Sequence, residues 1–171
     1  IRPLSAGGDH LCSLPILRAV GEKKPVGMIH FDAHTDLYDS YFGGFKYTHG
    51  TPFRRAIEEG VLDPKRTIQI GLRGSMYDLD DFKYGEKMGV RLMRIEEAVE
   101  LGPQKVMEIA RGVVGDQETY VSFDIDMLDR IRRVDRRSRG LDRNRAPVGQ
   151  GVACVDDEVH DHLVELARIH P

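Results

Sequence analysis

Residues 29–36, Ile-His-Phe-Asp-Ala-His-Thr-Asp, constrain the fold of this chain more than any other stretch. The apolar residues 25–29 lead directly into four metal-binding side chains: His30, Asp32, His34 and Asp36. Residues two apart on a strand share one face, but a buried carboxylate is strongly unfavourable unless it is paired or binds a metal. We therefore expect a buried strand that ends near Phe31 and delivers the last three of these side chains from its carboxyl end.

A second predicted strand, residues 119–123, ends in the same way, because Asp124 and Asp126 follow it directly. Predicted helices separate the predicted strands, and this order implies a parallel sheet with right-handed crossovers. The carboxyl ends of parallel strands meet at one edge of the sheet, where ligand sites form. His10 follows a pair of glycines in an early loop and is a further ligand candidate. The two strand exits and this loop are therefore expected to converge.

Periodicity and turn residues predict the remaining elements of an α/β fold. We expect further strands over residues 67–72 and 90–95. We expect helices in five places: a short one N-capped by Ser13, then 52–59, 78–88, 96–101 and 104–114. Gly102-Pro103 separates the last two helices. Residues 37–50 are rich in aromatic residues and glycine, and they predict a long loop of the kind that is often functional.

The candidate ligands form a mixed oxygen and nitrogen set without a thiolate. They are His10, Asp32, His34, Asp36, Asp124 and Asp126. This composition suits Mn²⁺ and, less exclusively, Zn²⁺, Fe²⁺ or Co²⁺. The charge of four carboxylates favours two divalent ions over one. Two such ions about 3.5–4 Å apart share a water molecule and lower its pKa.

Composition and charge limit the other classes of function. The 171 residues have the size of one domain or part of one, and the net charge is -3. This charge gives no global reason to expect nucleic-acid or membrane binding. No apolar run reaches the roughly 18 residues of a transmembrane helix, so none is expected. Cys12 and Cys154 do not indicate a disulfide framework, and a cytoplasmic location is the expectation.

Three segments resemble the signature motifs of the ureohydrolase (arginase/agmatinase) family. They are Gly-Gly-Asp-His at 7–10, His-Phe-Asp-Ala-His-Thr-Asp at 30–36 and Ser-Phe-Asp-Ile-Asp-Met-Leu-Asp at 122–129. The loop 38–53, with Thr-His-Gly-Thr-Pro-Phe at its end, is more similar to the agmatinase and guanidinobutyrase branch than to the arginases. The resemblance covers residues 5–129.

This resemblance implies a three-layer α/β/α fold with a mainly parallel sheet and a binuclear manganese hydrolase of polyamine metabolism. The substrate would be a small guanidino compound, agmatine-like, which is cleaved to urea and an amine, and the full-length protein would be a homo-oligomer. One manganese ion would bind His10, Asp32, Asp36 and Asp124. The other would bind His34, Asp32, Asp124 and Asp126, so that Asp32 and Asp124 bridge the two ions.

The resemblance also implies the chemistry. A hydroxide that bridges the metals attacks the guanidinium carbon, and the amine must leave protonated. His49 and Asp126 are the candidate catalytic residues for this proton transfer. His49 matches the family histidine of the His-Gly loop; the alternative is a loop histidine without a role. His30 matches no ligand position, and we interpret it as a residue that supports the ligands or packs in the core.

The sequence departs from the family pattern on both sides of the matched region. The chain begins at Ile1, almost directly before the first motif, so residues 1–129 are expected to form a partial catalytic domain. Arg130 stands where the family has proline, and no glutamate matches the family residue that contacts the substrate. Residues 130–145 contain eight arginines, a charge block that is typically disordered. The predicted three-layer fold is therefore incomplete at both ends.

Residues 130–171 form a separate aberrant segment in this prediction, with an amphipathic helix over 155–169. One hypothesis is a reading-frame shift near codon 129. Asp142-Arg143-Asn144-Arg145 can be encoded GAC-CGG-AAC-CGG, and a shift of one base gives Thr-Gly-Thr, which the family has in its next loop. A genuine divergent tail is the alternative.

Three functional hypotheses stay open from the sequence. The first is a guanidino-compound hydrolase of agmatinase type, with guanidinobutyrase, guanidinopropionase or arginase activity as alternatives within the same class. The second is a catalytically dead, metal-binding fragment. The third is nucleic-acid binding by the arginine-rich segment, against which the lack of interleaved aromatic residues argues.

Overall fold

Four parallel strands form one sheet in the part of the chain that the computed structural model describes, residues 4–73 and 81–128. The strand order is β3-β2-β1-β4, so the strand that opens the ligand-rich stretch is central. The elements are η1 (His10–Cys12), α1 (Ser13–Val20), β1 (Val26–Phe31), α2 (Pro52–Glu58), β2 (Leu62–Leu72), α3 (Asp81–Met88), β3 (Arg91–Arg94), α4 (Ile95–Val114), β4 (Thr119–Phe123) and η2 (Ile125–Met127).

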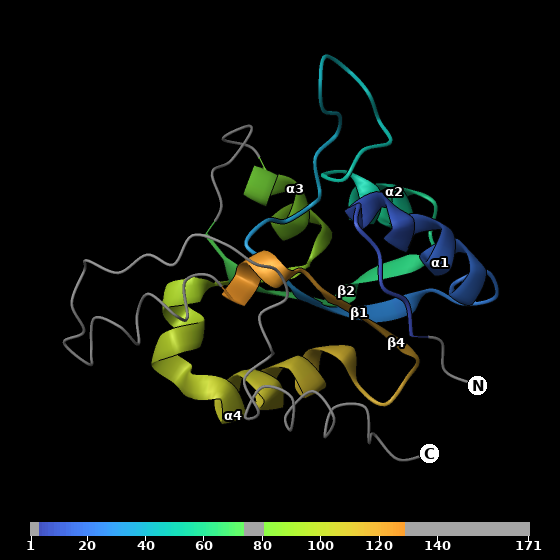
Figure 1. The fold of residues 1–171 in the computed structure, drawn as a ribbon. Coiled ribbons are helices and arrows are strands. Elements are labelled where there is room, and N and C mark those ends of the chain that lie inside the picture. Colours follow the sequence, from blue (N-terminus) through green and yellow to red (C-terminus); the bar gives the residue numbers. More distant parts are fainter. Residues whose placement is uncertain (1–3, 74–80, 129–171) are drawn as a thin grey trace, which may run out of the picture. The chain divides into compact units, whose positions relative to one another are not determined.

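Helices cover both faces of the sheet and make three layers (Figure 1). Successive side chains of β1 point to opposite faces. Met28 packs with α1 and α2, whereas Ile29 and Phe31 pack with α4. The buried character of all six β1 residues follows from this double coverage. The predicted α/β/α arrangement with a parallel sheet is confirmed.

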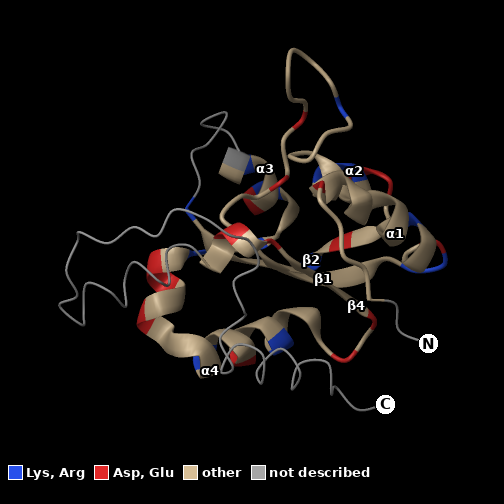
Figure 2. Cartoon of the chain, viewed as in Figure 1, with Lys and Arg blue, Asp and Glu red and all other residues tan. Residues whose placement is uncertain are grey.

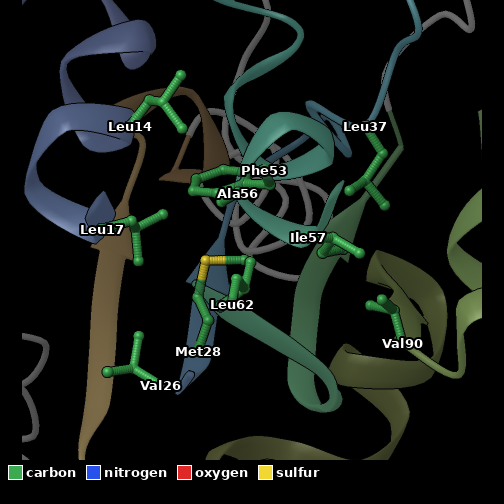
Figure 3. Packing of buried hydrophobic residues seen from close by; sticks show 10 residues of the cluster. All are labelled: Leu14, Leu17, Val26, Met28, Leu37, Phe53, Ala56, Ile57, Leu62 and Val90. Carbon is green, nitrogen blue, oxygen red and sulfur yellow. The ribbon is translucent and has the colours of Figure 1, made fainter. Parts of the chain in front are cut away.

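The core between the sheet and α1 and α2 is built from interlocking apolar side chains (Figure 3). Leu17 of α1 and Phe53 of α2 are 0% exposed and belong to the same buried cluster as Met28. Burial of each such side chain contributes about 1.5–3 kcal/mol relative to exposure. Phe53 also connects this core with the candidate ligands, because its ring centroid lies 5.1 Å from that of His10 and 4.5 Å from that of His30.

Helix α4 is bent at the position that the sequence indicates. Gly102 has φ 75° and ψ 161°, which is not helical, and Pro103 follows it. Glycine tolerates this conformation without a steric penalty, and proline lacks the N–H that would continue the helix. The predicted break between two helical segments is confirmed.

Three predicted boundaries are wrong in detail. Strand β2 begins at Leu62 instead of residue 67, because Leu62 pairs with Val26 ahead of an irregularity in the register. Strand β3 ends at Arg94, and α4 begins at once with Ile95. Ser13 is the first residue of α1 instead of its N-cap, and its hydroxyl lies 3.0 Å from the Tyr120 hydroxyl of β4.

The arginine-rich segment and the predicted helix over 155–169 lie outside the described residues. The division into domains after residue 129 therefore stays a prediction. Among the residues with a described structure, no helix has the length and apolar character needed to span a membrane.

Candidate metal centre

The exits of β1 and β4 lie beside each other at one edge of the sheet. The two strands pair in parallel, with Phe31 opposite Phe123. The pairing continues past the strands, since the Asp124 N–H donates to the Phe31 carbonyl at 2.8 Å and the Asp32 N–H donates to the Ile70 carbonyl at 3.1 Å. The turn η2 follows β4 directly, with Asp124 as its N-cap and Asp126 within it. Two carboxylate-bearing segments distant in the sequence are thus brought together, as expected.

Asp32 lies at the centre of the site, with one carboxylate oxygen facing each of two histidines. Its Oδ2 is 3.2 Å from Nδ1 of His10, and its Oδ1 is 3.4 Å from Nδ1 of His34. The Asp32 side chain is only 2% exposed. A carboxylate in this position can be shared by two neighbouring cations, one on each oxygen.

The first group of donors surrounds the ring of His10. Nδ1 of His10 lies 2.8 Å from Oδ2 of Asp36 and 3.8 Å from Oδ2 of Asp124. Nε2 of His10 lies 2.8 Å from the Ser122 hydroxyl of β4. This second contact allows the ring to donate a proton to Ser122 while Nδ1 stays free to accept a cation, as metal-bound histidines usually do.

The second group of donors contains His34 and Asp126. Nδ1 of His34 lies 3.1 Å from Oδ2 of Asp126. Oδ1 of Asp126 accepts a hydrogen bond of 3.1 Å from the N–H of Ala33, so the β1 exit orients the carboxylate of the β4 exit. This group is open to solvent, because the two side chains are 40% and 38% exposed.

The turn that carries Asp36 is unusual. Asp36 has φ 51°, a left-handed conformation that aspartate tolerates better than most other residues. Its carbonyl accepts a hydrogen bond of 3.3 Å from the N–H of Phe53 at the start of α2. The turn folds the chain back, and Asp36 thereby reaches the same histidine as Asp32.

Opposite charges are strongly coupled in the site. Burial opposes a charge on His10, yet its hydrogen bonds to Asp32 and Asp36 raise its pKa to about 10. A hydrogen bond to Asp126, and a second to Asp32, raise the pKa of His34 to about 10. Burial likewise opposes a charge on Asp32, but its hydrogen bonds with these histidines and His30 hold its pKa well below the usual range. Burial raises the pKa of Asp36.

The donor set fits divalent cations. Among the residues that the structure describes, two sets of side chains bring their ligand atoms within 4.8 Å of one another: His10, His30, Asp32 and Asp36, and then Asp32, His34 and Asp126. Asp124 belongs to neither set, although it contacts His10; its Oδ1 accepts a hydrogen bond of 2.9 Å from the Asp126 N–H. Oxygen and imidazole donors without a thiolate suit Mn²⁺, Fe²⁺, Co²⁺ or Zn²⁺.

His30 belongs to the first set by distance, but its geometry is that of a supporting residue. It is fully buried, and its Nε2 lies 2.9 Å from Oδ2 of Asp32. Its ring also contacts Phe53. Both parts of the interpretation from sequence, support and packing, therefore describe this residue.

His49 lies apart from these donor sets, on the loop between β1 and α2 that extends away from the sheet (Figure 1). Its ring contacts are with Tyr41 and Phe42 of the same loop, at 5.1 and 5.7 Å. The neck of the loop is closed by a hydrogen bond of 3.0 Å from the Tyr38 N–H to the Gly50 carbonyl. A catalytic role for His49 thus stays a prediction.

Two supporting residues, Gln69 and Ser122, escaped the sequence analysis. Each is a buried polar residue with an apolar residue on either side of it in its strand. Ser122 precedes Asp124 by two residues, as His30 precedes Asp32, so both face the same side as the ligand that follows. This spacing was a usable signal for Ser122. The role of Gln69 depends on the pairing of β2 with β1, which the sequence does not reveal.

Comparisons with known proteins identify relatives of this chain. The profile of the arginase family matches residues 1–131. Guanidinopropionase from Pseudomonas aeruginosa is 61% identical over 127 residues, which make up 74% of this chain and 40% of that protein. The mitochondrial agmatinase of Gallus gallus is 48% identical over 128 residues, or 74% of this chain and 37% of that protein.

A solved structure has a similar fold. Proclavaminate amidinohydrolase from Streptomyces clavuligerus superposes with a TM-score of 0.66 at 41% sequence identity, covering 70% of this chain and 40% of that one. The chain thus spans about 40% of the length of the relatives it matches.

Proposed function

The chain belongs to the arginase family, and we propose that it hydrolyses a guanidino compound to urea and an amine at a site for two divalent cations. Mn²⁺ is the proposed ion, on the basis of the mixed carboxylate and imidazole donors. The chain that would carry this activity spans about 40% of the length of its relative guanidinopropionase.

One observation carries this proposal. The two oxygens of Asp32 face the Nδ1 atoms of different histidines, His10 and His34, and each histidine has a further carboxylate next to it. A single cation would need only one such group. Two adjacent groups that share a buried carboxylate support a site for two cations.

We assign the residues as follows. His10 and Asp36 would hold one cation, His34 and Asp126 the other, and Asp32 and Asp124 would contact both. When bound, two such cations lower the pKa of a shared water molecule and stabilise charge on the attacking oxygen. Ser122 would keep the ring of His10 oriented, and the N–H of Ala33 would orient Asp126.

The amine that leaves must gain a proton, so the reaction needs a general acid. Asp126 is one proposed donor, because its carboxylate lies at the open side of the site. His49 is the other, and its position on a loop that begins directly after Asp36 allows it to close over a substrate. The loop carries only two charged residues, Asp39 and Lys46, so its remaining surface would exclude water from the reaction (Figure 2).

A guanidino acid is the proposed substrate ahead of agmatine. The relative that shares 61% of its residues with this chain bears the name guanidinopropionase, whereas the identity to the chicken agmatinase is 48%. The proposed guanidino acid differs from the agmatine-like substrate that the motifs alone favoured.

The test measures metal content and urea release together. The chain is loaded with Mn²⁺ and supplied with 3-guanidinopropionate, 4-guanidinobutyrate, agmatine or arginine. We expect urea from the guanidino acids first and none after chelation. The substitution Asp124→Ala should abolish urea release, whereas Asp116→Ala, at an exposed acidic residue of the turn before β4, should leave it unchanged.

A second candidate, a metal-binding chain without catalysis, rests on the partial length of this protein relative to its relatives. Binding of two equivalents of Mn²⁺ without urea release from any of the four substrates would support it. Absence of both metal binding and urea release would overturn the proposed function.

A further inference from the structure

Gln69 is a fully buried amide in strand β2, next to the central strand of the sheet. It pairs in register with His30 of β1, so the two side chains lie on the same face. That face packs against Phe53 of α2, which contacts the ring of His30. Neither Gln69 nor His30 belongs to the ligands assigned above, yet together they lie directly behind them.

The orientation of the Gln69 amide follows from its partners. Its Nε2 lies 2.6 Å from the carbonyl oxygen of Thr35 and 3.1 Å from Nδ1 of His30. A carbonyl oxygen can only accept, so the atom that faces it must be the NH₂ group. The second N–H of this group then points to Nδ1 of His30.

This hydrogen bond determines the tautomer of His30. Because the Gln69 amide nitrogen can only donate, Nδ1 of His30 must accept, and the proton of the neutral ring lies on Nε2. Nε2 is the atom 2.9 Å from Oδ2 of Asp32, so His30 donates to this carboxylate. Gln69 thus acts on Asp32 through His30.

The other N–H of Gln69 acts on the next part of the ligand loop. Thr35, whose carbonyl it holds, stands between His34 and Asp36. The residue that follows this carbonyl has the left-handed φ of 51°. One amide group therefore fixes both the carboxylate of Asp32 and the turn that brings Asp36 to the same site.

The other end of the amide has an energetic cost. Within the described part of the chain, Oε1 of Gln69 is buried without a hydrogen-bond partner. A buried acceptor left without a partner costs about 1–3 kcal/mol. An apolar side chain of similar length would avoid this cost, so packing alone does not explain an amide at this position. Its two N–H groups do.

We propose that Gln69 is the positioning residue of the metal centre: its NH₂ group fixes His30 in the tautomer that donates to Asp32 and, at the same time, fixes the Thr35 carbonyl between His34 and Asp36. This inference rests on the proposed metal site and adds a residue to it that is not a ligand. Loss of support behind metal ligands typically lowers metal affinity by about 10–100-fold.

The first experiment compares two buried substitutions in the same strand. Gln69→Met keeps the length and removes both donors. Thr67→Val keeps the shape of Thr67, a buried residue whose hydroxyl donates to the Asp63 carbonyl at 2.7 Å, away from the ligands. We expect Mn²⁺ affinity, measured by calorimetry on the folded chain, to fall about 10–100-fold in Gln69→Met and to stay unchanged in Thr67→Val.

The second experiment needs no substitution. Long-range ¹H–¹⁵N NMR of the wild-type chain reports which ring nitrogen of His30 carries the proton. We expect a proton on Nε2 and an unprotonated Nδ1. A protonated Nδ1 in the wild-type chain would overturn the proposal, even if Gln69→Met fails to fold.

The outcomes separate this inference from the proposed function. If the wild-type chain binds Mn²⁺ and Gln69→Met binds it with the same affinity, the role of Gln69 is wrong and the metal centre stands. If the wild-type chain binds no Mn²⁺, the metal centre is wrong, and the NMR result still decides whether Gln69 sets the tautomer of His30.

Discussion

The two strand exits of this site supply carboxylates in different ways. At the exit of the central strand β1, Asp32 is buried and receives hydrogen bonds from the side chains of three histidines. At the exit of β4, Asp124 and Asp126 are 36% and 38% exposed. These two aspartates are oriented largely by main-chain N–H groups, those of Asp126 and Ala33.

The position of each strand in the sheet accounts for this difference. Strand β1 has β2 on one side and β4 on the other, so residues of both neighbours reach the groups around Asp32. Gln69 of β2 acts through His30, and Ser122 of β4 acts through His10. In the described sheet β4 pairs with β1 alone, and the carboxylates at its exit are oriented by the N–H of Asp126 in the local turn and by the N–H of Ala33 in the β1 exit. A strand with a neighbour on each side can thus preorganise a ligand through side chains of both neighbours, whereas the carboxylates that follow the outer strand are oriented mainly by main-chain N–H groups of the two exits.

The largest effect is expected from substitutions that separate the two exits. Asp32→Asn removes the carboxylate that both donor groups share, so both Mn²⁺ ions should be lost, with an affinity loss beyond the roughly 10–100-fold caused by changes behind the ligands. Asp126→Asn affects only the His34 group and should reduce the stoichiometry from two ions to one. Elemental analysis of dialysed protein measures both values.

Circular dichroism of the two metal-free variants is the control, since both should keep the fold. An equal loss of both ions in Asp126→Asn would show that the two exits act as one unit. The difference between the β1 and β4 exits would then have no effect on metal affinity.

A smaller effect is expected from pH in the metal-free chain. The pKa values of His10 and His34 are both raised to about 10, so protonation of these histidines stabilises the folded state. This contribution is fully present below pH 6.5, the usual pKa of histidine. This contribution is lost as the pH rises from about 6.5 to 10. The lowered pKa of Asp32 acts in the opposite sense, because its contribution is present above the usual value of 3.8 and is lost as the pH falls.

Urea unfolding between pH 5 and pH 10 measures this dependence. The metal-free chain should be most stable in the acidic part of the range and should weaken toward pH 10. With Mn²⁺ in excess the decrease should disappear, because the cations take the place of the two protons, and metal affinity should rise with pH. A metal-free chain whose stability stays constant up to pH 10 would contradict the charge coupling at the site.

The smallest effect is expected in the loop of residues 37–50 between β1 and α2, where Asp39 contacts α2. Its Oδ1 lies 3.2 Å from the guanidinium groups of Arg54 and Arg55, and the Arg55 hydrogen bond is the main cause of its lowered pKa. Asp39→Asn should leave Mn²⁺ content unchanged and reduce stability by less than about 1 kcal/mol, since ion pairs near the surface contribute little. Amide hydrogen exchange of residues 40–50 should become faster.

Asp116→Asn, at an exposed acidic residue outside this loop, is the matched control and should leave exchange in the loop unchanged. Loss of Mn²⁺ in Asp39→Asn would show that the loop and the ligands are energetically coupled. The residues that support the ligands at the β1 exit would then include the contact between Asp39 and α2.

The predicted elements were accurate where periodicity and turn residues agree. The bounds of β4, the end of β1 at Phe31 and the break at Gly102 follow from local sequence. The start of β2 could not be predicted, because Leu62 joins the strand only by pairing with Val26 of β1, and a proline follows within the irregularity before Thr67. Ser13 was misplaced since a 3-10 turn capped by Asp9 precedes α1.

The sequence by itself determined the family of this protein and the side chains of its candidate metal site. The aspartates and histidines are adjacent along the chain, and their spacing after apolar strands indicates a metal site without coordinates. The tertiary structure alone decided which residue lies behind His30. Gln69 lies far from His30 in the sequence, and only the register of β2 on β1 brings its amide to the ring. Ligand identity is a local property of the chain, whereas ligand orientation depends on which strands are neighbours.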